Sequence, residues 1–384
     1  MDYQRTGLFQ SVLYVYGDYI MIDVTVKTIG KNNYFITLAE DFSLLKDKLD
    51  SVNLSDGANK LCIISDSNVW PLYGEEVKNI LSGFVNDIVE VIIEPGEISK
   101  KLENLEQCYS VLKDNEFNRN DIIVALGGGV VCDYAGYAAA TFKRGVRYIM
   151  IPTSLSAMAD CTVGGLAELD FDGYKNLMGA NIFPNYVYCN IGCLNTLEPA
   201  FFYSGFAVVM RTAVVKSSSV YEWLIDKLYE ISDKDVLTLT DMIEQNINLK
   251  KIYAEKDPLG EGDQLLFGLG NNIGLALYKA KEDSMSYGEC LALGIICAAH
   301  ISMKREMLSL DEYLEIRDMF VPFNLPITVE DINIDEIADS ALVYDNFVLL
   351  KKIGKAVIDK NVTKEEITAA LDEIKFSDDD YVVE

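Results

Sequence analysis

The sequence predicts an α/β protein, with an amino-terminal parallel α/β domain followed by a carboxy-terminal all-helical domain. Three observations lead to this fold class. Short β-branched runs alternate with helical patterns of roughly ten or more residues over the first half of the chain. A strand-like run at 122–126 leads directly into three glycines and another helical pattern. After about residue 197, long helical patterns dominate.

The length of the chain predicts two domains. At 384 residues it exceeds what one hydrophobic core usually serves, and half of its residues are apolar. The change from alternating elements to helices places the boundary near 190. We therefore expect an α/β domain at 1–190, with 1–21 as a possible extension, and a helical domain at 191–384.

The elements of the first domain are expected in the following order. Residues 11–28 carry aromatic and β-branched residues around a Gly-Asp turn and predict a strand hairpin, either an appendage or a dimer edge. The remaining elements are a strand at 34–37, a helix at 42–49, a strand at 61–65, a helix with Leu72, Val77 and Leu81 on one face, a strand at 88–93, a helix at 97–112, and the strand at 122–126 with its helix from Val130.

The second domain is expected to consist of helices. Apolar residues recur there at helical spacing, and Thr363 is placed to cap the last helix. The predicted helices are 201–223, 236–254, 273–281, 288–304, 310–319 and 363–374.

Composition excludes several classes of function. The formal net charge of −27 would repel a phosphate backbone, so we expect no nucleic-acid binding. No uninterrupted run of about 18 apolar residues exists, and the start lacks a basic region leading into an apolar one, so neither membrane insertion nor secretion is expected. Eight cysteines lie scattered without a CxxC pair, as is typical of reduced thiols in a cytoplasmic protein.

The glycines at 127–129 favour phosphate binding. Between a strand and a helix, residues without side chains let the backbone approach a pyrophosphate, and the N–H groups at the helix start favour negative charge. A tight strand-to-helix turn is the alternative interpretation.

Several further motifs occur in a fixed order, and together they carry a family resemblance. They are Asp66-Ser67-Asn68-Val69, Pro95-Gly96-Glu97-Ile98-Ser99-Lys100, GGGVVCD at 127–133, Lys143-Arg144-Gly145, Pro152-Thr153-Ser154-Leu155, Asp160, Gly164-Gly165, Lys175-Asn176-Leu177-Met178-Gly179-Ala180 and Thr196-Leu197. In order and spacing the chain resembles the 3-dehydroquinate synthase family, the sugar phosphate cyclases. Members bind NAD and a divalent metal, usually zinc, and convert a seven-carbon sugar phosphate into a carbocycle.

The resemblance implies an NAD site in the first domain and a small-molecule ligand in a cleft between the domains. Asp66 and Asn68 would contact the adenosine end, and Glu97 and Lys100 the adenine ribose. The pyrophosphate would lie on Gly128, Gly129 and Val130, and the rest of the site would be lined by Asp133, Thr153, Ser154, Asp160 and Lys175. Taken singly, Asp66 could instead cap a strand end, and Asp133 could favour a helix dipole.

The metal site that the resemblance implies is not matched by the residues. The family's patterns AEVIK, GHT and HGE supply one Glu and two His, and here they read AVVMR at 207–211, Gly270-Asn271-Asn272 and Tyr287-Gly288-Glu289. Val208 has no lone pair to donate, Asn271 is a weak oxygen ligand, and a phenol such as Tyr287 stays protonated at neutral pH. The single histidine, His300, lies outside these patterns on an apolar helix. No zinc is therefore expected.

Three hypotheses follow. The first is a pseudoenzyme that keeps NAD and acts by association, as a homodimer or with a paralogue. The second is a metal-independent NAD-dependent enzyme acting on a sugar phosphate or polyol; its candidate catalytic groups are Lys250, Arg211, Tyr287, Glu289, Asp170 and the retained cation Arg144. The third is an active cyclase with another metal, held by Asn271, Tyr287, Glu289 or the nearby Glu282 and Asp283.

Overall fold

The protein divides into two compact units. The structure, a computed structural model, describes residues 11–16, 19–28, 33–53, 57–85, 87–281, 284–344 and 346–376. Unit 1 consists of Met1–Leu197 and Val236–Leu259, and unit 2 of Glu198–Asp235 and Gly260–Glu384. The two predicted domains were continuous segments, whereas unit 1 takes up the later helix α9, Val236–Ala254, which contacts its second and third strands.

Unit 1 is built on an eight-stranded sheet. Six strands are parallel, and their order in space is β3, β10, β7, β6, β4, β5. The parallel sheet was predicted, but β7 and β10 were not among its predicted strands. Two antiparallel strands, β1 and β2, extend the β3 edge. The bounds are β1 Ser11–Tyr16, β2 Tyr19–Val26, β3 Tyr34–Ala39, β4 Lys60–Asp66, β5 Asp87–Ile93, β6 Ile122–Gly127, β7 Arg147–Pro152 and β10 Tyr186–Asn190.

The predicted hairpin at 11–28 is confirmed as β1 and β2, but it is not an appendage. Strand β2 pairs with β3 from Met21 opposite Ala39 to Val26 opposite Tyr34, and the side chains of Val24 and Ile36 are fully buried. The expected extension at 1–21 is therefore wrong for 11–16 and 19–21, which form sheet strands. Its first ten residues and the Gly-Asp turn at 17–18 lie outside the described residues.

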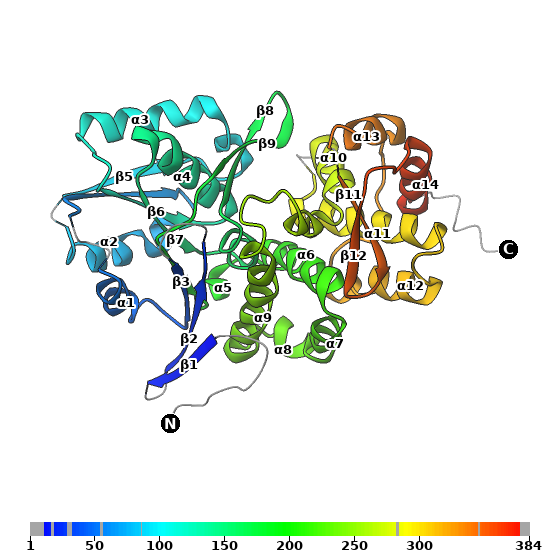
Figure 1. The fold of residues 1–384 in the computed structure, drawn as a ribbon, viewed down its shortest axis with the longest axis horizontal. Helices are drawn as coiled ribbons and strands as arrows, with labels where there is room; N and C mark the ends of the chain where they lie inside the picture. Colours follow the sequence, from blue (N-terminus) through cyan, green and yellow to red (C-terminus); the bar gives the residue numbers. More distant parts are fainter. Residues whose placement is uncertain are drawn as a thin grey trace. The chain divides into compact units, whose positions relative to one another are not determined.

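Helices cover both faces of this sheet. In Figure 1, α3 and α4 lie on one face and α1 and α2 on the other, as right-handed crossovers require. The bounds are α1 Leu45–Ser51, α2 Glu75–Leu81, α3 Leu105–Asp114, α4 Gly129–Thr141 and the short α5 Cys193–Thr196. Turns of 3₁₀ or π type occur at η1 Trp70–Gly74, η2 Glu97–Ser99, η3 Leu102–Asn104, η4 Phe142–Arg144 and η5 Ala157–Cys161.

Two helix predictions in unit 1 need correction. The helix expected at 97–112 starts only at Leu105, because the backbone before it forms two 3₁₀ turns and Lys101 pairs with Asp170. Val77 and Leu81 are buried as expected, but Leu72 is 55% exposed. It lies in the π-type turn η1, whose periodicity differs from that of an α-helix.

A second, two-stranded sheet was not predicted. Strands β8, Leu166–Phe171, and β9, Tyr174–Asn181, form an antiparallel hairpin that packs on α4. It carries the acidic and basic side chains that matter for the candidate site below.

Unit 2 consists of helices and one small hairpin. The predicted helix at 201–223 is divided at Ser217, whose extended backbone ends α6 and whose hydroxyl caps α7. Helix α13 and the hairpin of β11 and β12 were not predicted. The bounds are α6 Pro199–Lys216, α7 Ser218–Asp226, α8 Leu228–Ser232, η6 Asp263–Gly268, α10 Asn271–Lys281, α11 Tyr287–Lys304, α12 Leu310–Asp318, η7 Val321–Phe323, α13 Ile334–Ala341, β11 Phe347–Lys352, β12 Lys355–Asp359 and α14 Lys364–Ile374.

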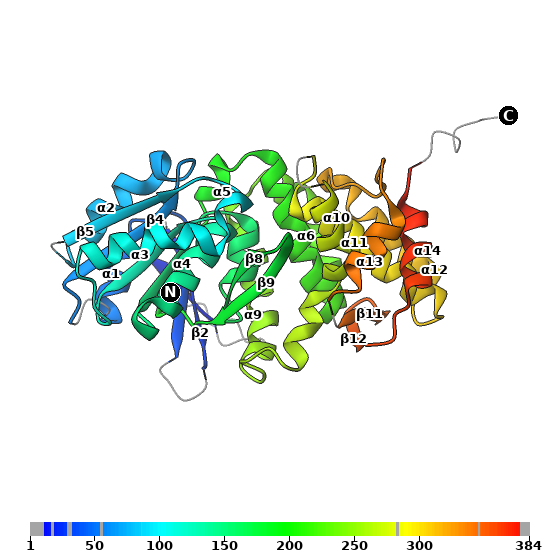
Figure 2. The ribbon, with the colours of Figure 1, turned by 90° about the horizontal axis from the view of Figure 1, so that it is seen from above.

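Helix α11 is the central element of unit 2, in contact with α6, α10, α12, α14 and β11 (Figure 2). Its glycines allow backbones to approach closely: a Cβ at Gly288 would lie 2.1 Å from the carbonyl oxygen of Ser204 on α6. A Cβ at Gly294 would lie 2.2 Å from the carbonyl oxygen of Gly270, at the start of α10. The relative positions of these three helices are thus set by backbone contact.

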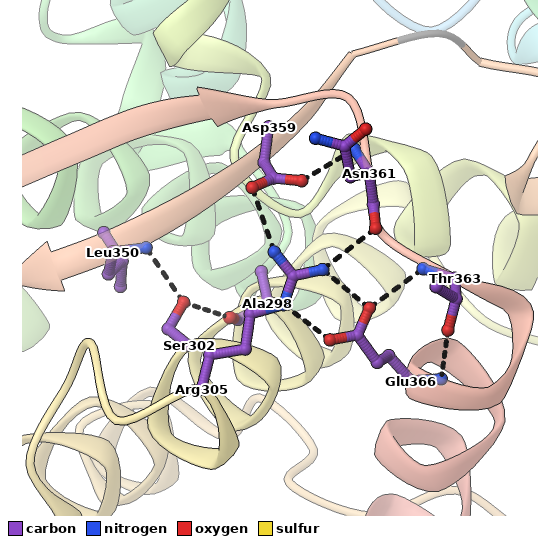
Figure 3. A network of polar contacts seen from close by, with 8 residues as sticks. All are labelled: Ala298, Ser302, Arg305, Leu350, Asp359, Asn361, Thr363 and Glu366. Atoms are coloured by element: carbon purple, nitrogen blue, oxygen red, sulfur yellow. Dashed lines mark hydrogen bonds and ion pairs between the residues drawn. The ribbon is translucent and has the colours of Figure 1, made fainter.

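The end of α11 is held to the later elements by Arg305 (Figure 3). Its guanidinium donates to Asp359 at 2.9 Å, to the carbonyl oxygen of Asn361 at 3.0 Å and to Glu366 at 2.7 Å. One cation thus links α11, β12 and α14.

In the part of the chain that the structure describes, no helix has the length and apolar character needed to cross a membrane.

Candidate functional site

The topology of unit 1 marks the ends of β4 and β6 as a candidate ligand site. These strands are neighbours, yet the chain leaves β4 toward β5 on one side and leaves β6 toward β7 on the other. Such a switch point opens a crevice at the carboxyl ends of the strands, where open α/β sheets bind ligands. Asp66 ends β4, and Gly127 ends β6.

The glycines after β6 form an open backbone surface at the start of α4. A Cβ at Gly128 would lie 3.4 Å from the Ser154 hydroxyl, and one at Gly129 would lie 3.8 Å from the Cys161 sulfur, both tolerable contacts. Neither glycine has a positive φ. Gly127 differs, because a Cβ there would lie 2.6 Å from that of Val131. Neither packing nor backbone conformation within the chain therefore requires glycine at 128 and 129.

A pyrophosphate would explain those two glycines. The first N–H groups of a helix have no partner within the helix, and α4 begins at Gly129 with Val130 in its first turn. Thr153 and Ser154 lie beside this turn: the Thr153 N–H donates to the carbonyl oxygen of Gly127 at 2.9 Å. The residues present therefore fit the pyrophosphate part of NAD.

Next to the glycines lies a buried cluster of charged residues. The Lys100 ammonium pairs with Asp133 of α4 at 2.6 Å and donates to the Asn176 amide oxygen of β9 at 2.6 Å. Lys175 of β9 lies 3.0 Å from Asp170 and 3.9 Å from Glu97. Four predicted cofactor residues, Glu97, Lys100, Asp133 and Lys175, are thus brought together from η2, α4 and the β8–β9 hairpin.

Burial and charge shift the pKa values in this cluster. Burial opposes the charge of Lys100, but Asp133 and Glu97 together raise the pKa of Lys100 well above its usual value. Burial also raises the pKa of Glu97, which Lys100 partly offsets. Lys100 is therefore a permanent cation at neutral pH, surrounded by acceptors of the kind that suit ribose hydroxyls.

Asp66 and Asn68 have a more local role in the structure. One Asp66 carboxylate oxygen accepts hydrogen bonds from the backbone N–H groups of Asn68 and Val69, each at 2.9 Å. The carboxylate thus shapes the turn after β4, in agreement with the capping interpretation. The Asn68 side chain is exposed.

Lys250 and Asp160 meet within unit 1. Lys250 is buried on α9, and its ammonium donates to the Asp160 carbonyl oxygen at 2.8 Å and pairs with the Asp160 carboxylate. A predicted catalytic cation and a predicted cofactor residue are therefore ion-paired to one another. Arg144, in contrast, is exposed at the other end of the 13-residue helix α4, about 20 Å from the glycines.

Of the three positions in unit 2 that the resemblance assigns to metal ligands, Asn271 and Tyr287 are in contact, and Val208 lies one helical turn from Arg211, which also contacts Asn271. The Asn271 side-chain oxygen accepts hydrogen bonds from the Arg211 guanidinium at 2.9 Å and from the Tyr287 hydroxyl at 3.3 Å. Val208 is buried on α6, one helical turn before Arg211. The amide oxygen is thus directed at two donors, one of them a cation, and these residues do not fit a divalent metal.

The other candidate metal ligands do not complete such a site. Glu289 forms a capping box at the start of α11, where its carboxylate accepts from the Ser286 N–H at 2.7 Å. Across the described ranges, no three His, Cys, Asp or Glu residues are grouped so that they could hold a metal ion. Glu282 and Asp283 lie outside the described residues.

The sequence did not identify Asn176 and Glu168 as members of the charged cluster. Asn176 has a left-handed backbone, with φ of 55°, and its N–H donates to Asp170 at 3.0 Å. The Glu168 N–H donates to Asp133 at 3.3 Å. The only signal in the sequence was the position of Asn176 next to Lys175 in a family motif.

Comparisons with known proteins extend over most of the chain. The family model described as 3-dehydroquinate synthase N-terminal matches residues 90–204, and the one described as 3-dehydroquinate synthase C-terminal matches residues 205–346. The 3-dehydroquinate synthase of Clostridium botulinum is 32% identical over 343 residues, covering 87% of this chain and 96% of the relative. That of Acetivibrio thermocellus is 30% identical over 346 residues, covering 88% and 95%.

Two solved structures share the fold. The 2-epi-5-epi-valiolone synthase ValA of Streptomyces hygroscopicus subsp. jinggangensis 5008, with NAD⁺ and Zn²⁺ bound, has a TM-score of 0.81 at 22% identity and covers 91% of this chain and 98% of its own. A 2-deoxy-scyllo-inosose synthase complexed with carbaglucose-6-phosphate, NAD⁺ and Co²⁺ has a TM-score of 0.81 at 21% identity, covering 91% and 99%.

Proposed function

The chain belongs to the 3-dehydroquinate synthase family, and from that premise we propose that it binds NAD but does not catalyse the family's metal-dependent cyclisation. The observation that carries the proposal is the contrast between its two units. Unit 1 has a glycine surface and a charged cluster that fit a dinucleotide. Unit 2 places Val208, Asn271 and Tyr287 at the metal-ligand positions.

The NAD part of the proposal is supported by the fit at Gly128 and Gly129. When bound, NAD supplies reversible oxidation of an alcohol. Gly128, Gly129 and Val130 would hold the pyrophosphate by their backbone N–H groups, and Glu97 and Asp133 would accept from ribose hydroxyls. Lys100 would keep these carboxylates in place.

The absence of cyclase activity is supported by the donor set in unit 2. A metal in this family holds and polarises the oxygens of the substrate, and its loss removes several kcal/mol of transition-state stabilisation. Of the side chains at these three positions, Asn271 has the oxygen most able to bind a metal, and this oxygen already accepts a hydrogen bond from Arg211 at 2.9 Å. We therefore expect no phosphate release from the seven-carbon sugar phosphate that the family cyclises.

A metal-independent oxidoreductase is the second candidate, but the contacts favour it less. Glu289 caps α11, the Tyr287 hydroxyl donates to Asn271, and Lys250 is paired with Asp160. Each of these candidate catalytic groups is therefore held by another residue of the chain in a contact that stabilises the fold. Reduction of bound NAD by a polyol or a sugar phosphate, followed by the absorbance of the reduced nicotinamide, would favour this candidate over the first.

The decisive experiment analyses the protein as purified. Mass spectrometry of released small molecules is expected to find NAD, and elemental analysis is expected to find no stoichiometric zinc. Stoichiometric zinc with phosphate release from the sugar phosphate would contradict the proposal, and so would a failure to bind added NAD⁺ in calorimetry.

A matched pair of variants tests where NAD binds. Gly129→Ala adds a methyl group whose nearest neighbour in the chain is 3.8 Å away, so it should fold normally yet lose at least about tenfold in NAD affinity through contact with the pyrophosphate. Gly83→Ala, where the nearest atom is 3.4 Å away in unit 1, is the control. Equal NAD affinity in both variants would place the cofactor elsewhere.

A protein without cyclase activity would act by association, and we propose a homodimer or a complex with an active paralogue. The β8–β9 hairpin exposes Leu166, Phe171 and Leu177, which is apolar surface available for such a contact. Mass photometry of the purified chain should show a dimer, and a monomer would leave the paralogue as the partner to test.

A further inference from the structure

Arg211 is a buried cation at the centre of the changed metal-ligand positions. It is 2% exposed, and it projects from α6 one turn after Val208. Its Nη1 atom donates to the Asn271 side-chain oxygen at 2.9 Å. The Tyr287 hydroxyl donates to the same oxygen at 3.3 Å. The guanidinium therefore lies beside the atom that replaces an imidazole ligand of the family.

We propose that Arg211 excludes divalent metal ions from unit 2, so that restoring the three lost ligands would not restore a zinc site while this arginine remains. The inference rests on the proposed function and deepens it: the loss of the metal is enforced by a new interaction as well as by missing ligands. The family pattern AEVIK has lysine at this position, where the chain has arginine.

Geometry supplies the first reason. A ligand atom at the place of the Asn271 oxygen would hold zinc at about 2 Å. Because Nη1 of Arg211 is 2.9 Å from that atom, the ion would lie within about 5 Å of the guanidinium. A dication and a cation repel strongly at this distance in a water-poor environment.

The chemistry of arginine supplies the second reason. A guanidinium stays protonated in proteins, whereas the ammonium of a buried lysine can lose its proton or turn away on a flexible stem. A glutamate restored at 208 would lie three residues before Arg211 on the same helix face, where it would pair with the guanidinium. In that ion pair the restored carboxylate would no longer be available to bind a metal.

The packing of unit 2 keeps the guanidinium in place. Gly288 next to Tyr287 packs against the Ser204 backbone of α6, where even a Cβ would approach to 2.1 Å. Gly270, before Asn271, is in similar contact with α11 through Gly294. The three helices therefore cannot separate to lengthen the distance between Arg211 and a bound ion without losing these contacts.

The test compares two variants that carry the same three ligands. The triple variant is V208E/N271H/Y287H, and the quadruple variant adds R211K. Zinc affinity is measured by competition with a chromophoric chelator, and site geometry by cobalt(II) absorption. We expect the quadruple variant to bind zinc about 100-fold or more tightly than the triple variant. Adding R317K instead, at an arginine that pairs with Asp318 on the surface of α12, is the control and should change nothing.

Equal zinc affinity of the triple and quadruple variants, including no binding by either, would overturn the inference. If these variants do not fold by circular dichroism, N271H/Y287H and N271H/Y287H/R211K make the same comparison with two imidazole ligands and without a carboxylate at the buried position 208. Zinc should then raise the melting temperature more in the variant that carries R211K, and equal shifts would contradict the inference. The proposed function is tested separately by the zinc content of the unmodified protein.

Discussion

Lys100 and Asp133 illustrate at the scale of single residues how the candidate site depends on buried charge. The two side chains are 6% and 14% exposed and 2.6 Å apart. A buried ion pair contributes little net stability compared with apolar residues, but removing one partner leaves an uncompensated charge. The glycine surface of the candidate site beside this pair therefore depends on both members being present.

Lys100→Met is expected to lower the free energy of unfolding by about 3 to 5 kcal/mol, because it leaves Asp133 buried without its cation. Urea unfolding followed by circular dichroism measures the change. Lys78→Met is the matched control, since Lys78 pairs with Glu90 on the surface, where water screens the charge. Equal losses in the two variants would mean that the Lys100 pair is not buried in solution.

His300 makes a second prediction at this scale, on pH. Burial lowers the pKa of His300, against the opposing effect of Glu373, whose carboxylate is 3.9 Å from Nε2. The ring also contacts Tyr313, and Lys304 lowers the pKa further. The unfolded chain therefore binds the proton more tightly than the folded chain does, and this contribution to stability falls as the pH drops below about 6.5.

Because the chain holds a single histidine, its titration can be observed directly. The imidazole carbon-bound protons should titrate in NMR spectra with a midpoint below 6.5. In His300→Gln the loss of stability between about pH 7 and 5 should become smaller. A midpoint above 6.5 would show that Glu373 outweighs burial.

At the scale of elements, the start of α11 positions both Tyr287 and the glycine contacts of unit 2. The Ser286 hydroxyl accepts from the Glu289 N–H at 3.4 Å, and the Glu289 carboxylate accepts from the Ser286 N–H at 2.7 Å. These two hydrogen bonds form a capping box, which fixes the first residue of the helix at Tyr287. The cap thus determines where the hydroxyl that contacts Asn271 is placed.

Ser286→Ala is expected to cost about 0.5 to 2 kcal/mol of stability, because an orphan N–H of α11 loses its acceptor. Thermal and urea unfolding measure this loss. Ser284→Ala, two residues earlier at an exposed position, is the control, because it removes a hydroxyl that donates to the Lys281 carbonyl oxygen at 3.3 Å and caps no helix. If both variants lose the same stability, the capping box is not formed in solution.

The sequence pattern within each segment was sufficient to predict most helices and strands. It did not predict where a helix is interrupted. The α14 cap at Thr363 and the strand at 122–127 followed from residues within the element. The divided helix at Ser217 and the 3₁₀ turns before Leu105 did not, because long-range partners decide them. The Gly354 N–H donates to the Val214 carbonyl oxygen at 2.7 Å near the first break, and Asp170 pairs with Lys101 near the second.

At the scale of the whole molecule, the net charge of −27 is the dominant feature. Self-repulsion of this size opposes the compact state, and salt screens it over a Debye length that falls from about 30 Å at 0.01 M to about 3 Å at 1 M. The same charge would repel nucleic acid, which is why the composition predicts no such partner.

The melting temperature is therefore expected to rise between about 0.01 M and 0.5 M sodium chloride, as scanning calorimetry would measure. Lys100 and Lys175 lie in buried pairs that salt screens weakly, so they should not reverse the trend. A fall in melting temperature over this range would show that attractive surface pairs outweigh the overall repulsion.

Motifs in a fixed order predicted the family, and periodicity predicted the parallel sheet with its helices. The glycines that fit a pyrophosphate were also predicted, because all of these features depend on residues close to one another along the chain. The residues Val208, Asn271 and Tyr287 stand at the positions to which the family resemblance assigns metal ligands. Only the tertiary structure showed that α9 belongs to unit 1, that Lys100 pairs with Asp133, and that Arg211 donates to Asn271. These contacts join residues far apart along the chain, and no local pattern specifies which distant side chains will share a buried volume.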